Sequence, residues 1–254
     1  MNTKYYADAN GVNLGVLKRC IKKAIELANS DEEIERVVLY SYTKDNLTSL
    51  AEIFGSDNLK NMFKTSVFFR GCTKPIQCAT EITYKKDCEY INRPKDVVVC
   101  CYMDSKSVFK VDDYMTAKYI IAMSWTLDGL NDWKKRWNAQ NVLGSNKEIM
   151  ERCDINPILQ VALTEMNDSM YNTKALIHTN DAEICKTYIR TIHKYLPEVT
   201  PSDIEDFLVR ELGWLNKNAA EVGGLLQRLK DGRTFQGGKK THLKEIYKNW
   251  TIRN

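Results

Sequence analysis

The chain has 254 residues, 43% of them hydrophobic and 28% charged, a composition typical of folded proteins that excludes collagen-like and disordered chains. Its 37 lysines and arginines outnumber its 33 aspartates and glutamates by only four, so the net charge by itself predicts neither a nucleic-acid partner nor a membrane partner. The length allows one large domain or two modest ones, and a chain of this size can bury a core without disulfide or metal support.

The longest apolar stretches are residues 97–103 and 119–125, far shorter than the roughly 20 residues that a membrane-spanning helix needs. The first fifteen residues lack the basic start, apolar middle and small-residue cleavage site of a secretory signal. We therefore expect a cytoplasmic protein without a membrane partner. The eight cysteines include no CxxC pair and are not grouped with the three histidines, so we interpret them as free thiols and give a structural zinc site little weight.

In chain order, the hydrophobic pattern first predicts a helix over residues 13–29, where apolar side chains recur at steps of three and four. Residues 36–42 follow as a buried strand, rich in β-branched and aromatic side chains. Asp45 is expected to cap a short helix after this strand. Residues 65–69 and 76–84 are predicted as two further strands.

Strand and helix then alternate along the chain. The pattern predicts strands at 97–103 and 117–124, and helices at 104–111 and 126–137. Such alternation is typical of parallel strands covered by helices. The sequence therefore predicts a mostly parallel α/β sandwich of five or six strands in residues 1–150.

The rest of the chain has a helical pattern almost throughout. Periodicity and capping residues predict helices at 156–170, 181–195, 201–212 and 216–230. A last amphipathic helix is expected to dock an apolar face made of Leu243, Ile246, Tyr247 and Trp250. We therefore expect a second, smaller, all-helical domain over residues 151–254.

Two adjacent glycines, Gly223 and Gly224, lie inside one of these predicted helices. Each costs about 1 kcal/mol there relative to alanine, so something should compensate. Close approach of another backbone is the simplest reason for glycine at this place. The substitution Gly223→Leu is then expected to destabilise the domain by steric clash.

Polar side chains follow three of the predicted strands, and open α/β sheets bind ligands at the carboxyl ends of their strands. If the three strands are neighbours, Asp45, Asp104 and Asp128 could form a catalytic site that holds Mg²⁺, with Lys44 and Lys106 near phosphate oxygens. The alternative is that the aspartates only cap helices, a role typically worth about 1 kcal/mol each. No glycine-rich phosphate loop follows the first predicted strand.

The C-terminal half resembles the layout of a winged helix-turn-helix. It has three predicted helices in sequence, a glycine turn at Gly213 between the second and third, and a basic segment afterwards. In that module the third helix enters the DNA major groove and the following hairpin touches the backbone. The resemblance implies nucleic-acid contacts from Lys217, Asn218, Arg228, Arg233, Lys239, Lys240 and Lys244.

The segment from residue 228 to the C-terminus carries eight basic and two acidic residues, a local net charge of +6 that exceeds the +4 of the whole chain. A concentrated basic segment with interspersed aromatic side chains is typical of a polyanion contact. The leading hypothesis is therefore a nucleic-acid-associated protein, in which the helical domain binds nucleic acid and the α/β domain senses a ligand, assembles or acts.

Two alternatives stay open. The first is a Mg²⁺-dependent phosphohydrolase or nuclease that uses Asp45, Asp104 and Asp128, with Mg²⁺ as its only cofactor. The second is a protein-interaction module, which an exposed apolar patch around Trp214 or Trp250 would favour.

Overall fold

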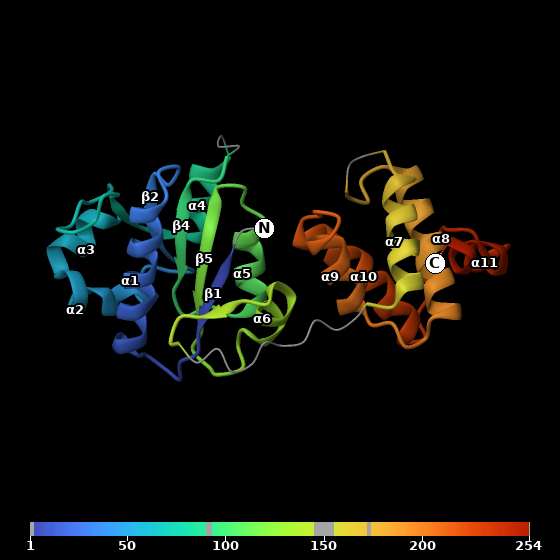
Figure 1. The fold of residues 1–254 in the computed structure, drawn as a ribbon, viewed down its shortest axis with the longest axis horizontal. Coiled ribbons are helices and arrows are strands. Elements are labelled where there is room, and N and C mark those ends of the chain that lie inside the picture. The colour runs from blue at the N-terminus through green and yellow to red at the C-terminus, as the bar shows by residue number, and fades with distance from the viewer. Residues whose placement is uncertain (1–2, 90–92, 145–154, 172–173, 254) are drawn as a thin grey trace. The chain divides into compact units, whose positions relative to one another are not determined.

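The computed structural model describes residues 3–89, 93–144, 155–171 and 174–253. The chain divides into two compact units, Met1–Glu151 and Arg152–Asn254, called here the α/β unit and the helical unit (Figure 1). The domain boundary expected near residue 150 and the thiol of Cys153 both lie outside the described residues. No helix in the ranges that the structure describes is long and apolar enough to cross a membrane.

Six strands form one sheet in the α/β unit: Lys4–Ala7 (β1), Arg36–Ser41 (β2), Ile76–Thr80 (β3), Asp96–Cys100 (β4), Ala117–Met123 (β5) and Gln140–Asn141 (β6). Every neighbouring pair is parallel, and the order across the sheet is β3-β2-β4-β5-β1-β6. The predicted α/β architecture with a mostly parallel sheet is therefore confirmed.

Helices cover both faces of this sheet (Figure 1). One face packs against α1 (Leu14–Ser30), η1 (Asp45–Leu50), α2 (Ala51–Phe54) and α3 (Ser56–Met62). The other packs against α4 (Glu81–Cys88), α5 (Ser105–Asp112) and α6 (Asn131–Trp137). Successive residues of a strand point to opposite faces, so Val97 and Val99 of β4 belong to the first core while Val98 and Cys100 belong to the second.

The sequence pattern did not predict β1, which lies inside the sheet between β5 and β6. The strand has only four residues and begins with Lys4, a residue type that rarely becomes buried. Lys4 is buried here because its ammonium group pairs with the Asp112 carboxylate at 2.7 Å. A contact between residues so far apart in the chain leaves no local signal.

Two expected strands differ in the structure. Residues 65–69 form no strand, and only Val67 pairs with the sheet, through an isolated bridge to Ile76. The strand expected at 76–84 ends at Thr80, because Thr80 and Thr83 form a capping box that starts α4.

Five helices make up the described part of the helical unit: α7 (Pro157–Asp168), α8 (Thr179–Tyr195), α9 (Pro201–Arg210), α10 (Asn216–Lys230) and α11 (Leu243–Arg253). Thr200 caps α9, with Pro201 in its first position and Asp203 completing a capping box. The last helix docks its aromatic face as expected, since Trp250 is fully buried and the Tyr247 ring stacks on that of Tyr195. An α/β part is thus followed by a helical part.

Candidate nucleic-acid interface

Two of the three aspartates expected at the sheet edge make local hydrogen bonds, and the helix cap expected of Asp45 is not formed. Asp104 caps α5, because its carboxylate accepts a hydrogen bond from the Ser107 backbone N–H at 2.9 Å. Asp128 accepts one from the Asn131 side-chain amide at 3.1 Å. Asp45 is the first residue of η1, a helix that no side chain caps.

No group of three or more His, Cys, Asp or Glu side chains in the described ranges is placed to hold a metal ion. Asp45, Asp104 and Asp128 all belong to those ranges, so the structure does not bring them together as a magnesium site. The capping alternative holds for Asp104. This role depends only on neighbouring residues, because the Asp104 carboxylate accepts its hydrogen bond from the first turn of the helix that follows it.

The segment from Arg228 to Arg253, called here the basic segment, is held against α8 by its backbone. The Gly238 N–H donates to Glu183 Oε2 at 2.6 Å, and the Lys239 N–H donates to Thr187 Oγ1 at 2.8 Å. Further along α8, the Arg190 guanidinium donates to the carbonyl oxygen of Phe235 at 2.7 Å. These contacts fix the middle of the basic segment.

Glycine is required where the segment crosses α8. Gly238 has a φ of +72°, a conformation that other residues rarely adopt. A Cβ atom at this position would lie 2.7 Å from the Cβ of Lys186 and 2.9 Å from the backbone nitrogen of Thr187. The close approach of two backbones therefore occurs here.

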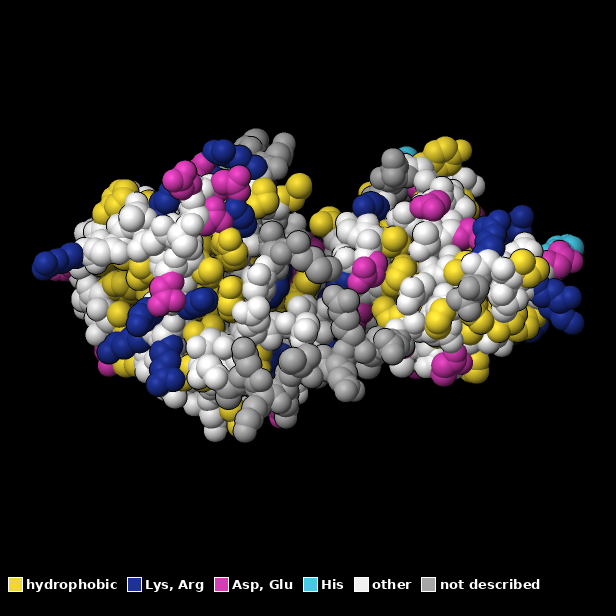
Figure 2. Space-filling model, in the orientation of Figure 1, with side chains coloured by type: hydrophobic (Ala, Val, Ile, Leu, Met, Phe, Trp, Pro, Cys, Tyr) yellow, Lys and Arg dark blue, Asp and Glu magenta, His cyan; other side chains and the backbone are white. Residues whose placement is uncertain are grey.

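The expected cationic side chains of the basic segment point to solvent. The exposed members of the predicted set are Arg228, Arg233, Lys239, Lys240 and Lys244. The neighbouring helix α8 places Arg190 beside the segment. It also carries Lys186, which pairs with Glu183 at 3.4 Å. Figure 2 shows Lys and Arg side chains gathered at the α11 end of the helical unit, and a second group over α1 in the α/β unit.

The structure departs from a winged helix-turn-helix in two ways. Asn218 of α10, expected to contact bases, is half-buried and donates its side-chain N–H to the carbonyl oxygen of Lys174 at 2.7 Å. Residues 231–242 after α10 form no strand, so the described chain has no hairpin in the position of a wing. Lys217 is exposed on α10.

Sequence reasoning missed Glu183, Thr187 and Arg190, which hold the basic segment in place. They lie about fifty residues before the backbone groups that they contact, and all three belong to an ordinary amphipathic helix. No local pattern marks them.

The two tryptophans proposed as markers of a protein-binding surface are internal. Trp214 is 3% exposed and its indole N–H donates to Asn167 Oδ1 at 2.9 Å. Trp250 is 0% exposed and packs against the Tyr188 ring. The patch that would favour a protein-interaction module is therefore not formed by these residues.

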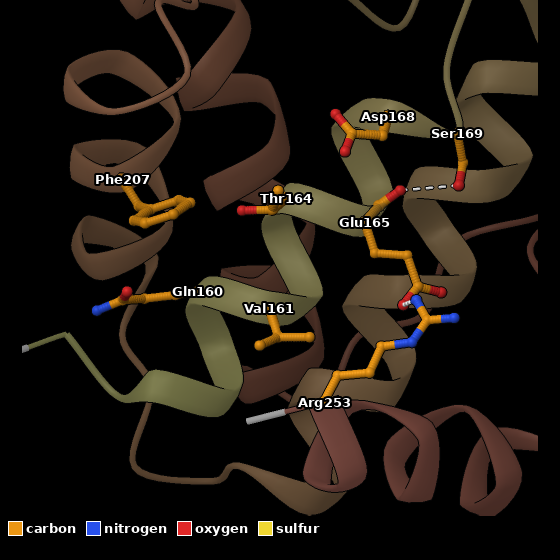
Figure 3. Close-up of a pocket in the computed structure, with 8 residues that line it drawn as sticks. All are labelled: Gln160, Val161, Thr164, Glu165, Asp168, Ser169, Phe207 and Arg253. Atoms are coloured by element: carbon orange, nitrogen blue, oxygen red, sulfur yellow. Dashed lines mark hydrogen bonds and ion pairs between the residues drawn. The ribbon is translucent and has the colours of Figure 1, made fainter.

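The helical unit also has a shallow groove of about 500 Å³ (Figure 3). Six of its lining residues come from the α7 region, with Phe207 of α9 and Arg253 of α11 completing it. Glu165 lies in the groove but is already engaged, because it accepts from the Tyr188 hydroxyl at 2.7 Å and pairs with Arg253 at 2.9 Å. The Glu165 carboxylate is therefore occupied by contacts within the protein.

Comparison with known proteins gives one result. Residues 155–251 match a family described as a domain of unknown function, DUF1889. The match lies within the helical unit and covers less than half of the chain. No curated protein and no solved structure matches the chain.

Proposed function

We propose that the helical unit binds nucleic acid through the exposed lysines and arginines of the basic segment. The observation that carries this proposal is that a segment with a net charge of +6 presents its cations to solvent from a backbone fixed on α8. A fixed backbone loses less conformational freedom on binding than a flexible tail does. Lysine and arginine side chains that neutralise phosphates release counterions, which supplies most of the affinity in non-specific binding.

The contacts of this proposal are with phosphates and not with base edges. Asn218 is already bonded within the protein, and the segment after α10 forms no hairpin. Phosphate contacts carry no sequence information. We therefore expect binding that is independent of sequence and weakens steeply with salt, and the α/β unit remains the proposed sensor, assembly or effector part of a cytoplasmic protein.

The test is fluorescence anisotropy of a labelled duplex and a labelled single strand with the full chain, over a range of salt concentrations and with Mg²⁺ present. The variant Lys239→Gln/Lys240→Gln/Lys244→Gln removes three exposed cations. Affinity should fall, and the slope of log K against log[salt] should become shallower by roughly 0.9 for each duplex phosphate that the variant leaves without its cation.

The α/β unit offers a matched control. Lys18, Arg19 and Lys22 are exposed on α1, so replacing all three by Gln removes the same charge from the other unit. This control should leave the slope unchanged. Equal slopes for the two triple variants, or no binding of either probe at low salt, overturns the proposal.

A further inference from the structure

The α/β unit has a cavity at the carboxyl end of β1. Its volume is about 540 Å³, within the range of small-molecule sites. The walls come from β1, the loop that leads from β5 into α6, α6 itself and the residues just after it. The lining residues are Tyr6, Asp8, Leu127, Asp128, Asn131, Asp132, Lys134, Lys135, Asn138 and Ala139.

The connectivity of the sheet explains why a hollow forms at this place. The chain leaves β1 towards α1 on one face of the sheet, whereas it leaves the neighbouring β5 towards α6 on the other face. The β1–α1 and β5–α6 connections therefore diverge at the carboxyl edge of the sheet. Open α/β sheets bind ligands in the crevice at such a switch point, outside the carboxyl ends of the strands.

One part of the cavity lining is an ion pair between Lys134 and Asp8. Lys134 Nζ lies 3.0 Å from Asp8 Oδ1 and sits over the Tyr6 ring, 4.9 Å from its centroid. The Lys134 side chain is only 13% exposed, so this pair is a fixed part of the wall. Because the charges of Lys134 and Asp8 cancel, the other charged residues of the lining determine which ligands the cavity favours.

Those remaining residues offer acceptors and donors together. Asp128 and Asp132 supply carboxylate oxygens, of which Asp128 Oδ1 also accepts from the Asn131 side-chain amide at 3.1 Å. Lys135 and Asn138 supply N–H groups, and all four residues are exposed. The lining has three carboxylates and two ammonium groups, an excess of one negative charge that disfavours phosphate and other anions. Leu127 and Tyr6 add apolar surface for carbon atoms.

We propose that this cavity binds a neutral polyhydroxylated ligand through a pair of neighbouring hydroxyl groups, as found in a nucleoside ribose or a free sugar. Neighbouring hydroxyls donate to a carboxylate and accept from an ammonium or amide group, so they use both kinds of lining residue. The site is separate from the basic segment and does not depend on nucleic-acid binding.

The experiment follows backbone amide chemical shifts of the full chain during titration with adenosine and, separately, D-glucose at millimolar concentrations. The two probes distinguish the nucleoside and sugar sources of the diol. Shift changes should concentrate in residues 127–139. The analogue 2′,3′-dideoxyadenosine lacks the diol and should bind roughly tenfold more weakly than adenosine or not at all, because a carboxylate is then left without its donors.

Matched variants assign the effect to the cavity. Asp128→Asn/Asp132→Asn should weaken binding of the active probe by roughly tenfold or more. Glu52→Gln/Asp57→Asn removes two exposed carboxylates from α2 and α3 and should leave binding unchanged. The proposal is overturned if neither diol probe shifts these amides, if both double variants behave alike, or if putrescine or inorganic phosphate binds the cavity instead.

Discussion

At the scale of single residues, the α/β unit depends on one buried carboxylate. Asp112 at the end of α5 has a side chain that is 2% exposed and pairs with the Lys4 ammonium at 2.7 Å. Its Oδ2 accepts the indole N–H groups of Trp133 at 2.6 Å and Trp137 at 2.8 Å. One side chain thereby joins β1, α5 and α6, which is why a lysine is tolerated inside the sheet.

The first prediction concerns this carboxylate. Asp112→Asn leaves the Lys4 ammonium buried without a counter-charge, so the free energy of unfolding should fall by about 3–5 kcal/mol. Urea denaturation, followed through the unfolding transition of the α/β unit, measures the change in this free energy. Asp57→Asn, at a carboxylate that is 96% exposed, is the control and should change it by less than about 0.5 kcal/mol. A decrease in Asp112→Asn no larger than in the control would contradict this account.

At the scale of elements, the contact between α9 and α10 explains one of the paired glycines. A Cβ atom on Gly223 would lie 2.9 Å from Cγ of Glu205 on α9, whereas a Cβ on Gly224 would have no atom within 4 Å. The sequence predicted a close approach at this pair, but the neighbour is a side chain and not a backbone. The two glycines therefore have different roles despite being adjacent.

The second prediction compares the two positions directly. Gly223→Leu should destabilise the helical unit by about 1–3 kcal/mol, because the added side chain displaces Glu205 from the helix contact. Gly224→Leu should be neutral or stabilising by up to about 1 kcal/mol, because leucine favours a helix interior over glycine. Thermal unfolding followed by circular dichroism gives both values. Equal effects at the two positions would show that the contact with Glu205 is not the reason for glycine here.

The third prediction concerns the contact between the basic segment and α8. The hydrogen bond from the Gly238 N–H holds the pKa of Glu183 below its ordinary value, with Lys186 adding to the effect. A carboxyl whose pKa is lower in the folded protein stabilises it above the ordinary pKa of about 4.3 and loses that contribution as pH falls through the folded value.

Acidification below this ordinary pKa should therefore weaken the contact of the segment with α8. The amide chemical shifts of Gly238 and Lys239, followed against pH, report this change. Glu183→Gln keeps an acceptor that does not titrate, so its Gly238 amide should show no matching pH dependence. The same titration curve in both proteins would mean that another group is responsible.

At the scale of the whole molecule, the chain consists of two units that each bury their own core. In the helical unit the fully buried residues include Leu163, Ile189, Leu226 and Trp250. The α/β unit has a separate apolar core on each face of its sheet. The family match covers residues 155–251, within the helical unit.

The fourth prediction is that residues 152–254, produced alone, fold. Their far-UV circular dichroism should be helical, and thermal unfolding should be a single cooperative transition, because these residues form a compact unit with buried apolar side chains of its own. Residues 1–151 produced alone are the counterpart. A helical fragment without a cooperative transition would show that its core needs the rest of the chain.

The sequence predicted much of the candidate interface but not its geometry. The charge of the basic segment is a property of composition, so the cations at Arg233, Lys239, Lys240 and Lys244 were found directly. The position of the segment on α8 depends on Glu183 and Arg190. The bond from Asn218 to the carbonyl oxygen of Lys174 likewise joins parts of the chain that are distant in sequence, so no local pattern indicates it.

The sequence by itself determined the fold class, because hydrophobic periodicity and capping residues act within one turn or one strand. It therefore predicted the alternating strands and helices of the first unit and the helices of the second. Tertiary structure alone decided the place of β1 in the sheet, through the Lys4–Asp112 pair. It also decided that Asp45, Asp104 and Asp128 do not form a group placed to hold a metal ion, and it formed the cavity beside β1. These features depend on which strands become neighbours, and strand order is set by contacts between residues far apart in the chain.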